Sequence, residues 1–326
     1  MATSAPKRSE ILVMGAGLAG LAASGLLQNS GKEVRIAEKG HGVGGRMATR
    51  RAGDATFDHG AQFITARSAR FSNAIRVWEE AGIAESWCKG FSAEADGHTR
   101  WRGKPSMTAI PKHLSRDLSI ELETEVVSLD HDGTEWRVVT RDGREIFAKI
   151  MIMTAPVPQS LALIDIGNFR LEHELRQQLE GLDYERCIAV MATLAVPSLV
   201  PAPGGFAPGD GPISWIADNQ KKGISARPAV TIHGTDSFSL SHWAEDREKA
   251  GLKLIEAARS WLGGTPESFQ VHGWKYSKPK TVFPEACVVA HQKPLLILAG
   301  DAFGGPKVEG AALSGWAAAE TVLNHS

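Results

Sequence analysis

Three glycines near the start of the chain have the spacing of a phosphate-binding turn. Gly15, Gly17 and Gly20 follow the apolar run 11–14 and lead into an Ala- and Leu-rich segment, 21–28, that predicts a helix. The first glycine permits a tight turn, the second lets backbone amides approach a pyrophosphate, and the third lets helix and strand pack closely. The N-terminus of the helix adds unpaired N–H groups and a partial positive charge. Glycine-rich turns of this kind also occur only to let a strand and a helix pack together. A second feature is therefore needed to predict a nucleotide-binding site.

Glu38 is that second feature. The segment 34–39 predicts the next strand, and Glu38 lies near its end. A carboxylate about 20 residues beyond the glycines can accept both hydroxyls of an adenosine ribose and would repel a 2′-phosphate. The alternative is a solvated strand end. Together with the glycines, Glu38 predicts a dinucleotide site.

Two polar segments follow this unit. The glycine-rich loop 40–47 contains Arg46, whose guanidinium could pair with a phosphate as a second clamp, unless the loop is only a flexible surface segment. In the segment 58–63, His59 and Gln62 flank small residues, which suits a backbone pressed against a planar ring. A hairpin turn with a surface histidine explains the second segment about equally well.

Composition narrows the class of protein. The chain has 326 residues, and its 36 basic and 37 acidic residues nearly cancel, which gives no reason to expect nucleic acid or an anionic membrane as a partner. Cys88, Cys187 and Cys287 lie far apart, as reduced thiols of a cytosolic protein would. The sequence shows neither a signal-peptide core nor an apolar run that could span a bilayer. We therefore expect a cytoplasmic protein.

Later segments predict the elements that position these residues. The strand 149–153 returns to a parallel sheet, and the apolar run 293–299 ends in Gly300 and Asp301, which places a carboxylate where such sheets bind ligands. Further strands indicate an antiparallel sheet in a second domain; they are expected at 188–196, 213–216, 229–233 and 238–243. Helices are expected at 158–182 and 245–262.

The motifs GAGLAG, then Glu38, then GVGGRMATR and DHGAQFITAR resemble the N-terminal signature of the FAD-containing amine oxidase superfamily. Within it, the chain is most similar to bacterial renalases. Further segments that agree are 100–105, 153–156, 272–276, and Gly300-Asp301 followed by 308–311. The resemblance extends from about residue 10 to the C-terminus.

The resemblance implies an α/β fold of two domains. One is a Rossmann-like FAD-binding domain, and the other is built on an antiparallel sheet plus helices, as in the p-hydroxybenzoate hydroxylase architecture. The FAD-binding domain is expected to contain 1–70, 105–158 and 286–326, and the substrate domain 71–104 and 159–285. The residues expected to contact FAD are Gly15, Gly17, Leu18, Ala19, Gly20, Glu38, Lys39, Gly45, Arg46, Met47, His59, Gly60, Ala61, Gln62, Val126, Ala155, Asp301, Val308, Glu309 and Ala311.

The resemblance also implies a substrate. Bacterial renalases oxidise isomeric dihydronicotinamide dinucleotides, reduced at ring positions other than C4, to NAD(P), and pass the electrons to O2. Such donors need no strong base, and the sequence shows no Ser/His/Asp set and no metal-ligand spacing. We expect His242, Trp243 and Trp274 to form a wall of the flavin pocket, although core packing is the alternative for such residues. No cysteine matches a covalent flavin position, so FAD is expected to be noncovalent.

Two other functions stay open. The chain could be a flavin amine oxidase or a desaturase that acts on another small molecule, although only two tyrosines, Tyr184 and Tyr276, are available for a paired-tyrosine cage. A non-catalytic nucleotide-binding sensor would keep the fold without turnover.

Overall fold

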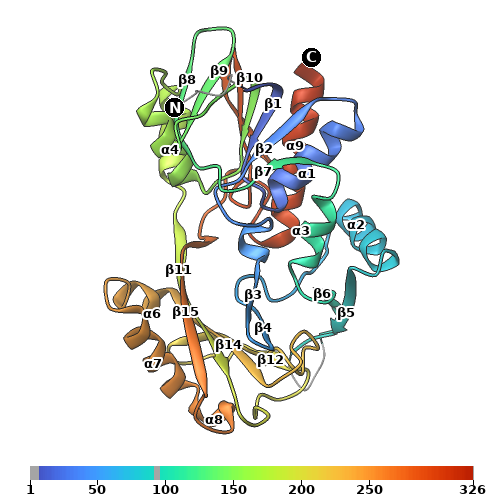
Figure 1. Cartoon of the computed structure of the whole chain (residues 1–326), viewed down its shortest axis with the longest axis vertical. Helices are drawn as coiled ribbons and strands as arrows, with labels where there is room; N and C mark the ends of the chain where they lie inside the picture. The colour runs from blue at the N-terminus through green and yellow to red at the C-terminus, as the bar shows by residue number, and fades with distance from the viewer. Residues whose placement is uncertain (1–6, 92–95, 326) are drawn as a thin grey trace. The chain divides into compact units, whose positions relative to one another are not determined.

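The computed structural model describes residues 7–91 and 96–325, and their contacts divide the chain into two compact units (Figure 1). Unit 1 comprises Met1–Gly45, Pro111–Asp183 and Pro279–Ser326, and unit 2 comprises Arg46–Ile110 and Tyr184–Lys278. This division follows contacts and not ligands: it groups 46–70 with unit 2, whereas we expected these residues to serve the cofactor. The domain boundaries expected from the sequence therefore stay a prediction.

Unit 1 is built around a mainly parallel sheet. Its strands are β1 (Lys7–Met14), β2 (Val34–Ala37), β7 (Ser119–Glu121), β8 (Val126–His131), β9 (Trp136–Thr140), β10 (Glu145–Met153), β16 (Val288–Gln292) and β17 (Leu295–Leu298). Along the sheet the order is β16-β17-β10-β1-β2-β7, with β16 antiparallel to β17 and the β8–β9 hairpin joined antiparallel to β10. The expected strand–turn–helix unit and the two returning strands are therefore present.

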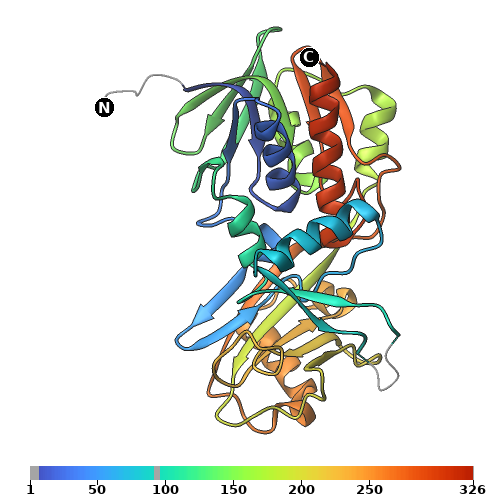
Figure 2. The same cartoon turned by 90° about the vertical axis from the view of Figure 1, so that its right-hand side faces the viewer.

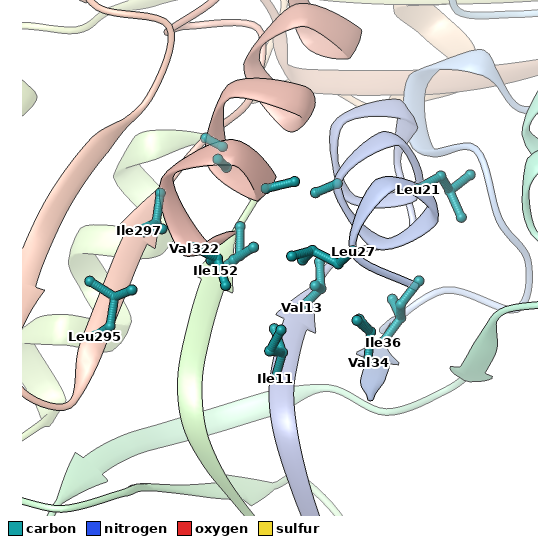
Figure 3. Packing of buried hydrophobic residues seen from close by; sticks show 14 of the residues in the cluster. Ile11, Val13, Leu21, Leu27, Val34, Ile36, Ile152, Leu295, Ile297 and Val322 are labelled. Carbon is teal, nitrogen blue, oxygen red and sulfur yellow. The ribbon is translucent and has the colours of Figure 1, made fainter. Parts of the chain in front are cut away.

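The helices of unit 1 bury the sheet. They are α1 (Leu18–Asn29), α4 (Val157–Ile166), α5 (His173–Glu180) and α9 (Lys307–His325). Helices α1 and α9 lie side by side (Figure 2). Aliphatic side chains of the sheet, such as Val13 and Ile152, pack with Leu27 of α1 and Val322 of α9 (Figure 3). This core includes residues of both β1 and α9, so the first strand and the last helix of the chain share one hydrophobic core.

Unit 2 is built around a second sheet, of order β12-β13-β14-β11-β15. Its strands are β11 (Tyr184–Thr193), β12 (Gly205–Phe206), β13 (Ile213–Asp218), β14 (Ala229–Gly234) and β15 (Ser268–Pro279). Helices α6 (Asp236–Ser241), α7 (Arg247–Ala257) and α8 (Arg259–Leu262) follow in the same unit, and α6 and α7 contact β11. On the helix side Val190 and Ile232 join the core, whereas Met191 packs with Phe57. The sheet thus has one face under helices and one face under the segment around residue 57.

The remaining elements of unit 2 do not belong to this sheet. They are the hairpin β3 (Thr49–Ala52) and β4 (Ala55–Asp58), the helix α2 (Ala69–Glu80), and the pair β5 (Ala84–Cys88) and β6 (Arg100–Gly103). Of these, β4 packs against the sheet. A short turn η1 (Gly45–Met47) and helix α3 (Ala109–Leu114) each cross the division between the units. The mixed α/β class with a Rossmann-like unit and an antiparallel second sheet is confirmed.

Two element predictions need correction. The segment 238–243 is not a strand, because the side chain of Thr235 accepts a hydrogen bond from the Phe238 amide and begins helix α6. The expected helix 158–182 is interrupted at Gly167, where an added Cβ would meet the Leu129 carbonyl oxygen at 2.3 Å. Within residues 7–91 and 96–325, none of the helices combines the length and apolar character needed to cross a bilayer.

Candidate functional site

The turn between β1 and α1 is shaped by its glycines. Gly15 has φ +106°, and a Cβ there would lie 2.7 Å from Thr154 Oγ1. A Cβ on Gly20 would lie 2.0 Å from the Gly15 carbonyl oxygen. Gly17 is different: among the described residues nothing lies within 4 Å of its Cβ position, and no side chain caps the start of α1 there. The Cβ position of Gly17 therefore leaves room beside the N-terminus of α1, where unpaired helix amides can bind an anion.

Glu38 lies next to this turn, at the end of β2. One carboxylate oxygen accepts the Ala16 amide at 2.7 Å, and the other accepts the Gly40 amide at 2.6 Å. The Gly44 amide donates to the Ala16 carbonyl at 2.8 Å, so the loop after Glu38 is tied to the glycine turn. Each carboxylate oxygen retains a lone pair that a ribose hydroxyl can use. The two features that predicted a nucleotide are therefore brought together within unit 1.

The C-terminal segment reaches the same edge of the sheet. Met14, Met153 and Leu298 are paired across β1, β10 and β17, so these three parallel strands end together. The Thr154 hydroxyl donates to the Met14 carbonyl at 2.9 Å, and buried Asp301 lies just beyond β17, after Ala299 and Gly300. Since ligands bind beyond the carboxyl ends of parallel strands, Asp301 stands at a binding edge.

Helix α9 is fixed to this edge by glycines as well. A Cβ on Gly315 would lie 2.1 Å from the Ala19 carbonyl oxygen of α1, and one on Gly310 would lie 1.8 Å from the Gly305 carbonyl oxygen. The Gly300 amide donates to the Ser314 hydroxyl at 2.8 Å. The first turn of α9, which carries the expected FAD residues Val308, Glu309 and Ala311, is thereby held in unit 1 together with the β1–α1 turn.

The other expected cofactor residues of unit 1 occupy defined positions. Lys39 donates to the Gln159 side chain at 3.3 Å, and Gly45, with φ +52°, has its Cβ position 3.7 Å from Gly17 Cα. Val126 begins β8 and is buried, and Ala155 follows β10. Gly45 is thus next to the glycine turn.

In unit 2, the loop that follows β4 folds back on η1. The Ala61 amide donates to the Arg46 carbonyl at 2.8 Å, and a Cβ on Gly60 would lie 2.0 Å from that oxygen. The Arg46 guanidinium donates to the Tyr276 and Ser277 carbonyls of β15, each at 3.3 Å, and Met47 is buried. The two polar segments singled out in the sequence are therefore in direct contact.

This loop, residues 58–62, holds two buried acceptors with no hydrogen-bond partner among the described residues. The Gln62 amide group donates to the Asp58 carbonyl at 2.6 Å and to the Gly60 carbonyl at 3.1 Å, which leaves Oε1 unpaired. His59 Nδ1 is also unpaired, while the ring hydrogen bonds with the Ala48 backbone. His59 is 4% exposed and Gln62 7%. Buried polar atoms are usually satisfied, so these two acceptors are available to a ligand that carries N–H or O–H donors.

The histidines around the loop are neutral at pH 7. Burial, followed by the charges of His272, Arg50 and His233, lowers the pKa of His59 to about 3. Burial lowers the pKa of His233 to about 4, and burial together with Arg50 and Arg247 lowers that of His272. His59 Nδ1 is therefore a hydrogen-bond acceptor at neutral pH and a poor general base.

Trp274 anchors the loop through a hydrogen bond. Its indole N–H donates to the His59 carbonyl at 2.9 Å, and His233 Nε2 lies 3.1 Å from the same oxygen, so that nitrogen carries a proton. The His59 ring lies 5.2 Å from both His272 and Trp274, whose own rings are 4.3 Å apart. We name His59, His233, His272 and Trp274 the imidazole–indole cluster.

His242 and Trp243 are not part of this cluster. His242 ends α6, stacks on Phe238 at 4.2 Å, and is hydrogen-bonded to the Phe238 carbonyl at 2.9 Å through Nδ1. The Trp243 ring lies 5.0 Å from the Arg186 guanidinium and 4.2 Å from that of Arg247, and 3.1 Å from the Cβ position of Gly273. Successive residues of a strand face opposite sides, so Trp243 and Trp274 lie on opposite faces of β15. The expectation that both form one wall depended on the strand that is in fact helix α6.

One pair was missed entirely. Lys222 Nζ lies 2.7 Å from Asp58 Oδ2, and both side chains are 0% exposed. Asp58 belongs to a recognised motif, but Lys222 stands in a polar stretch after β13 that carries no periodic signal. No local pattern could have indicated that this lysine is buried against a carboxylate so distant in the chain.

Two family models match this chain. Residues 13–81 match the NAD(P)-binding Rossmann-like domain, and residues 89–323 match the flavin containing amine oxidoreductase family. The chain is 28% identical to renalase of Mus musculus over 90% of its own length and 93% of that protein's. It is 30% identical to an acetone monooxygenase (methyl acetate-forming) of Gordonia sp. over 53% of its length, which is 31% of that protein.

Solved structures show the same fold. A redesigned putrescine oxidase superposes with a TM-score of 0.75 at 12% identity, over 99% of this chain and 100% of that one. The wild-type putrescine oxidase bound to putrescine gives 0.73 at 12% identity, over 98% and 100%.

Proposed function

The chain belongs to the flavin-containing amine oxidoreductase family as a renalase-like, FAD-dependent oxidoreductase, and we propose that it oxidises isomeric dihydronicotinamide dinucleotides, 2- or 6-dihydro-NAD(P), to NAD(P). O2 is the proposed electron acceptor, with H2O2 as its product. The similarity to mouse renalase over 90% of the chain supports this choice within the family.

The residues of unit 1 suit the adenosine and diphosphate of FAD. We assign the ribose hydroxyls to Glu38, the pyrophosphate to the amides at the N-terminus of α1 (Gly17, Leu18 and Ala19), and a further hydroxyl-bearing part to Asp301. An anion at the N-terminus of α1 would be stabilised by the helix dipole. In unit 2, the unpaired acceptors of His59 and Gln62 suit a group with N–H or O–H donors, which the flavin ring and ribityl chain both offer.

Once bound, FAD supplies the hydride acceptor, its N5 atom. The protein then has to orient the donor and exclude water. The observation that carries the proposal is the similarity to mouse renalase over 90% of the chain. The imidazoles agree with it: burial lowers the pKa of His59 to about 3 and that of His233 to about 4, so neither is an efficient base at pH 7. A dihydropyridine needs no base, because its C–H bond is already hydridic. Trp274 and His233 hold the loop 58–62, so their proposed role is positioning.

An amine substrate is the alternative. Tyr184 and Tyr276, the two tyrosines of the chain, are in edge-to-face contact, with ring centroids 5.5 Å apart and planes at 78°. No substrate fits between rings in that contact, so a cage formed by this pair is disfavoured.

Noncovalent attachment of FAD is supported by the cysteines. Burial raises the pKa of Cys187 to about 12, and burial also raises the pKa of Cys88 and Cys287. A protonated, buried thiol is a poor nucleophile toward a flavin. Acid precipitation should therefore release all of the yellow chromophore into the supernatant, and a chromophore left in the pellet would contradict noncovalent binding.

The substrate proposal is tested by oxygen uptake with a panel of donors. We expect 2- or 6-dihydro-NAD(P) to give equal amounts of NAD(P) and H2O2, while putrescine and ordinary NADH give little uptake. Rapid uptake with an amine, and none with the isomers, would favour the amine oxidase instead. A colourless protein that binds NAD without turnover would indicate a sensor.

A further inference from the structure

The Asp58–Lys222 pair lies in unit 2, next to the unpaired acceptors of the loop 58–62. The lysine bonds to one carboxylate oxygen of Asp58 at 2.7 Å. The other oxygen accepts the Thr49 hydroxyl at 2.7 Å and the Met107 amide at 3.1 Å. The Trp87 ring covers the ammonium at 5.2 Å. Asp58 is thus held from three different segments of unit 2.

Asp58 is also the first residue of the loop that carries His59 and Gln62. Its carbonyl accepts Gln62 Nε2 at 2.6 Å and the Thr231 hydroxyl at 3.0 Å, and its amide donates to the Asn219 side chain at 3.3 Å. Because both hydrogens of the Gln62 amide group are used on loop carbonyls, the direction of Gln62 Oε1 follows from the position of Asp58. The orientation of an unpaired acceptor therefore depends on where the carboxylate is held.

A buried ion pair often contributes little net stability to the folded state. The desolvation of two charges can exceed their attraction, and well-packed apolar residues of similar volume are often as stable or more so. Burial lowers the pKa of Lys222, with the neighbouring Arg102 charge acting in the same direction, while Asp58 opposes both. The pair does, however, fix the positions of both side chains. If either partner is removed, the other is left as an unpaired buried charge, which must move toward water or become neutral.

We propose that Lys222 is a positioning residue, which fixes the loop 58–62 through Asp58 so that His59 and Gln62 present their free acceptors to FAD. This inference rests on the proposed role of that loop in the flavin site. It assigns Lys222 no contact with the cofactor and no role in proton transfer.

The test compares FAD binding to apoprotein variants. Lys222→Met removes the cation and keeps the chain length, and the double variant Asp58→Asn with Lys222→Met removes both charges. Ser239→Ala is the matched control, since the buried Ser239 hydroxyl accepts the Ile188 amide at 2.9 Å on the helix face of the same sheet, away from the loop. For each protein the FAD dissociation constant, the visible absorption bands and fluorescence of bound flavin, and the thermal midpoint are measured.

We expect Lys222→Met to raise the FAD dissociation constant at least about tenfold, the loss that 1.4 kcal/mol produces, and to shift the flavin absorption bands. The double variant should regain thermal stability but not the wild-type flavin spectrum. Ser239→Ala should lower the thermal midpoint without altering the spectrum. Wild-type affinity and spectrum in Lys222→Met would overturn the inference, as would equal loss of FAD affinity in Lys222→Met and Ser239→Ala.

A further pair separates this inference from the function on which it rests. If His59→Ala and Gln62→Ala bind FAD with normal affinity and spectrum, the loop is not part of the flavin site and the proposed site itself fails. If FAD binding is impaired in those two variants and unchanged in Lys222→Met, only the role of Lys222 is refuted.

Discussion

Trp274 donates its indole N–H to the His59 carbonyl, so this residue acts on the candidate site through a hydrogen bond as well as through its ring. Replacing it with phenylalanine keeps an aromatic ring and removes the donor. A neutral hydrogen bond contributes about 1 kcal/mol, which corresponds to about a fivefold effect. We expect Trp274→Phe to lower kcat/KM by about that factor while FAD stays bound, and Trp274→Ala to lower it further.

Trp243→Phe is the informative comparison, because Trp243 lies on the other face of β15. Steady-state kinetics of the three variants show whether the Trp274 face of β15 alone, or both faces, matter for turnover. If Trp243→Phe impairs turnover as strongly as Trp274→Phe, the assignment of function to one face of β15 is wrong.

The buried imidazoles make the stability of the protein depend on pH. The pKa of His59 is lowered to about 3 and that of His233 to about 4, so between these values and 6.5 the unfolded chain binds more protons than the folded one. Stability is therefore full above about pH 6.5 and falls as the pH decreases. Each histidine should contribute about 2 kcal/mol of destabilisation between pH 7 and pH 5.

His233→Gln tests this dependence, since glutamine can still donate to the His59 carbonyl but does not titrate. Urea unfolding of apoprotein at several pH values should show a flatter profile for the variant, by about 2 kcal/mol. An identical pH dependence in variant and wild type would show that His233 is not buried as a neutral ring.

Among single residues, the roles of the glycines in the β1–α1 turn were predicted best from the sequence. Gly15 and Gly20 are required for the reasons of backbone angle and close approach that their spacing indicated. Lys222 could not be found, because the burial of a charged side chain is decided by a partner elsewhere in the fold. Asp58 begins the motif DHGAQFITAR, but nothing in the local sequence shows which cation it pairs with.

At the scale of elements, the contact of α1 with α9 joins the two ends of the chain. A Cβ on Gly315 would meet the Ala19 carbonyl oxygen at 2.1 Å, and backbone cannot give way as a side chain can. We expect Gly315→Ala to lower the free energy of unfolding by about 1–3 kcal/mol, the usual cost of overpacking. Urea unfolding of the apoprotein measures this loss.

Gly25→Ala is its control in the partner helix. Gly25 is inside α1, and in the part of the chain that the structure describes nothing lies within 4 Å of its Cβ position. Alanine there should be neutral or stabilising by up to about 1 kcal/mol, because it favours the helix. A Gly315→Ala protein as stable as Gly25→Ala would contradict the close packing of the two helices.

Element predictions succeeded where an apolar run was long and failed where a cap decided the outcome. The strands that end at Met14 and Met153 are buried runs, and they were placed correctly. At 238–243 the alternating apolar residues indicated a strand, but Thr235 begins a helix there. Helix α4 ends at Gly167, whose backbone is extended, and the Leu129 carbonyl leaves no room there for a side chain. That tertiary contact is not visible in any local pattern.

At the scale of the whole molecule, the sequence motifs predicted the α/β class, the family and FAD, and the family match over residues 89–323 confirms them. The expected pocket wall of His242, Trp243 and Trp274 was not predictable in the same way. It depends on which face of a strand a ring occupies, and that required the correct assignment of α6.

We propose that this FAD-dependent oxidoreductase takes a hydride from a nicotinamide ring that is reduced at a position other than C4. Rapid anaerobic mixing of the purified protein with one equivalent of each donor tests it most directly, by following the loss of the flavin absorbance. We predict full bleaching in a single phase by 2- or 6-dihydro-NAD(P), with NAD(P) as the product, and far slower bleaching by NADH or putrescine. Bleaching by an amine or by NADH as fast as by the isomers, or no bleaching by either isomer, would contradict the account.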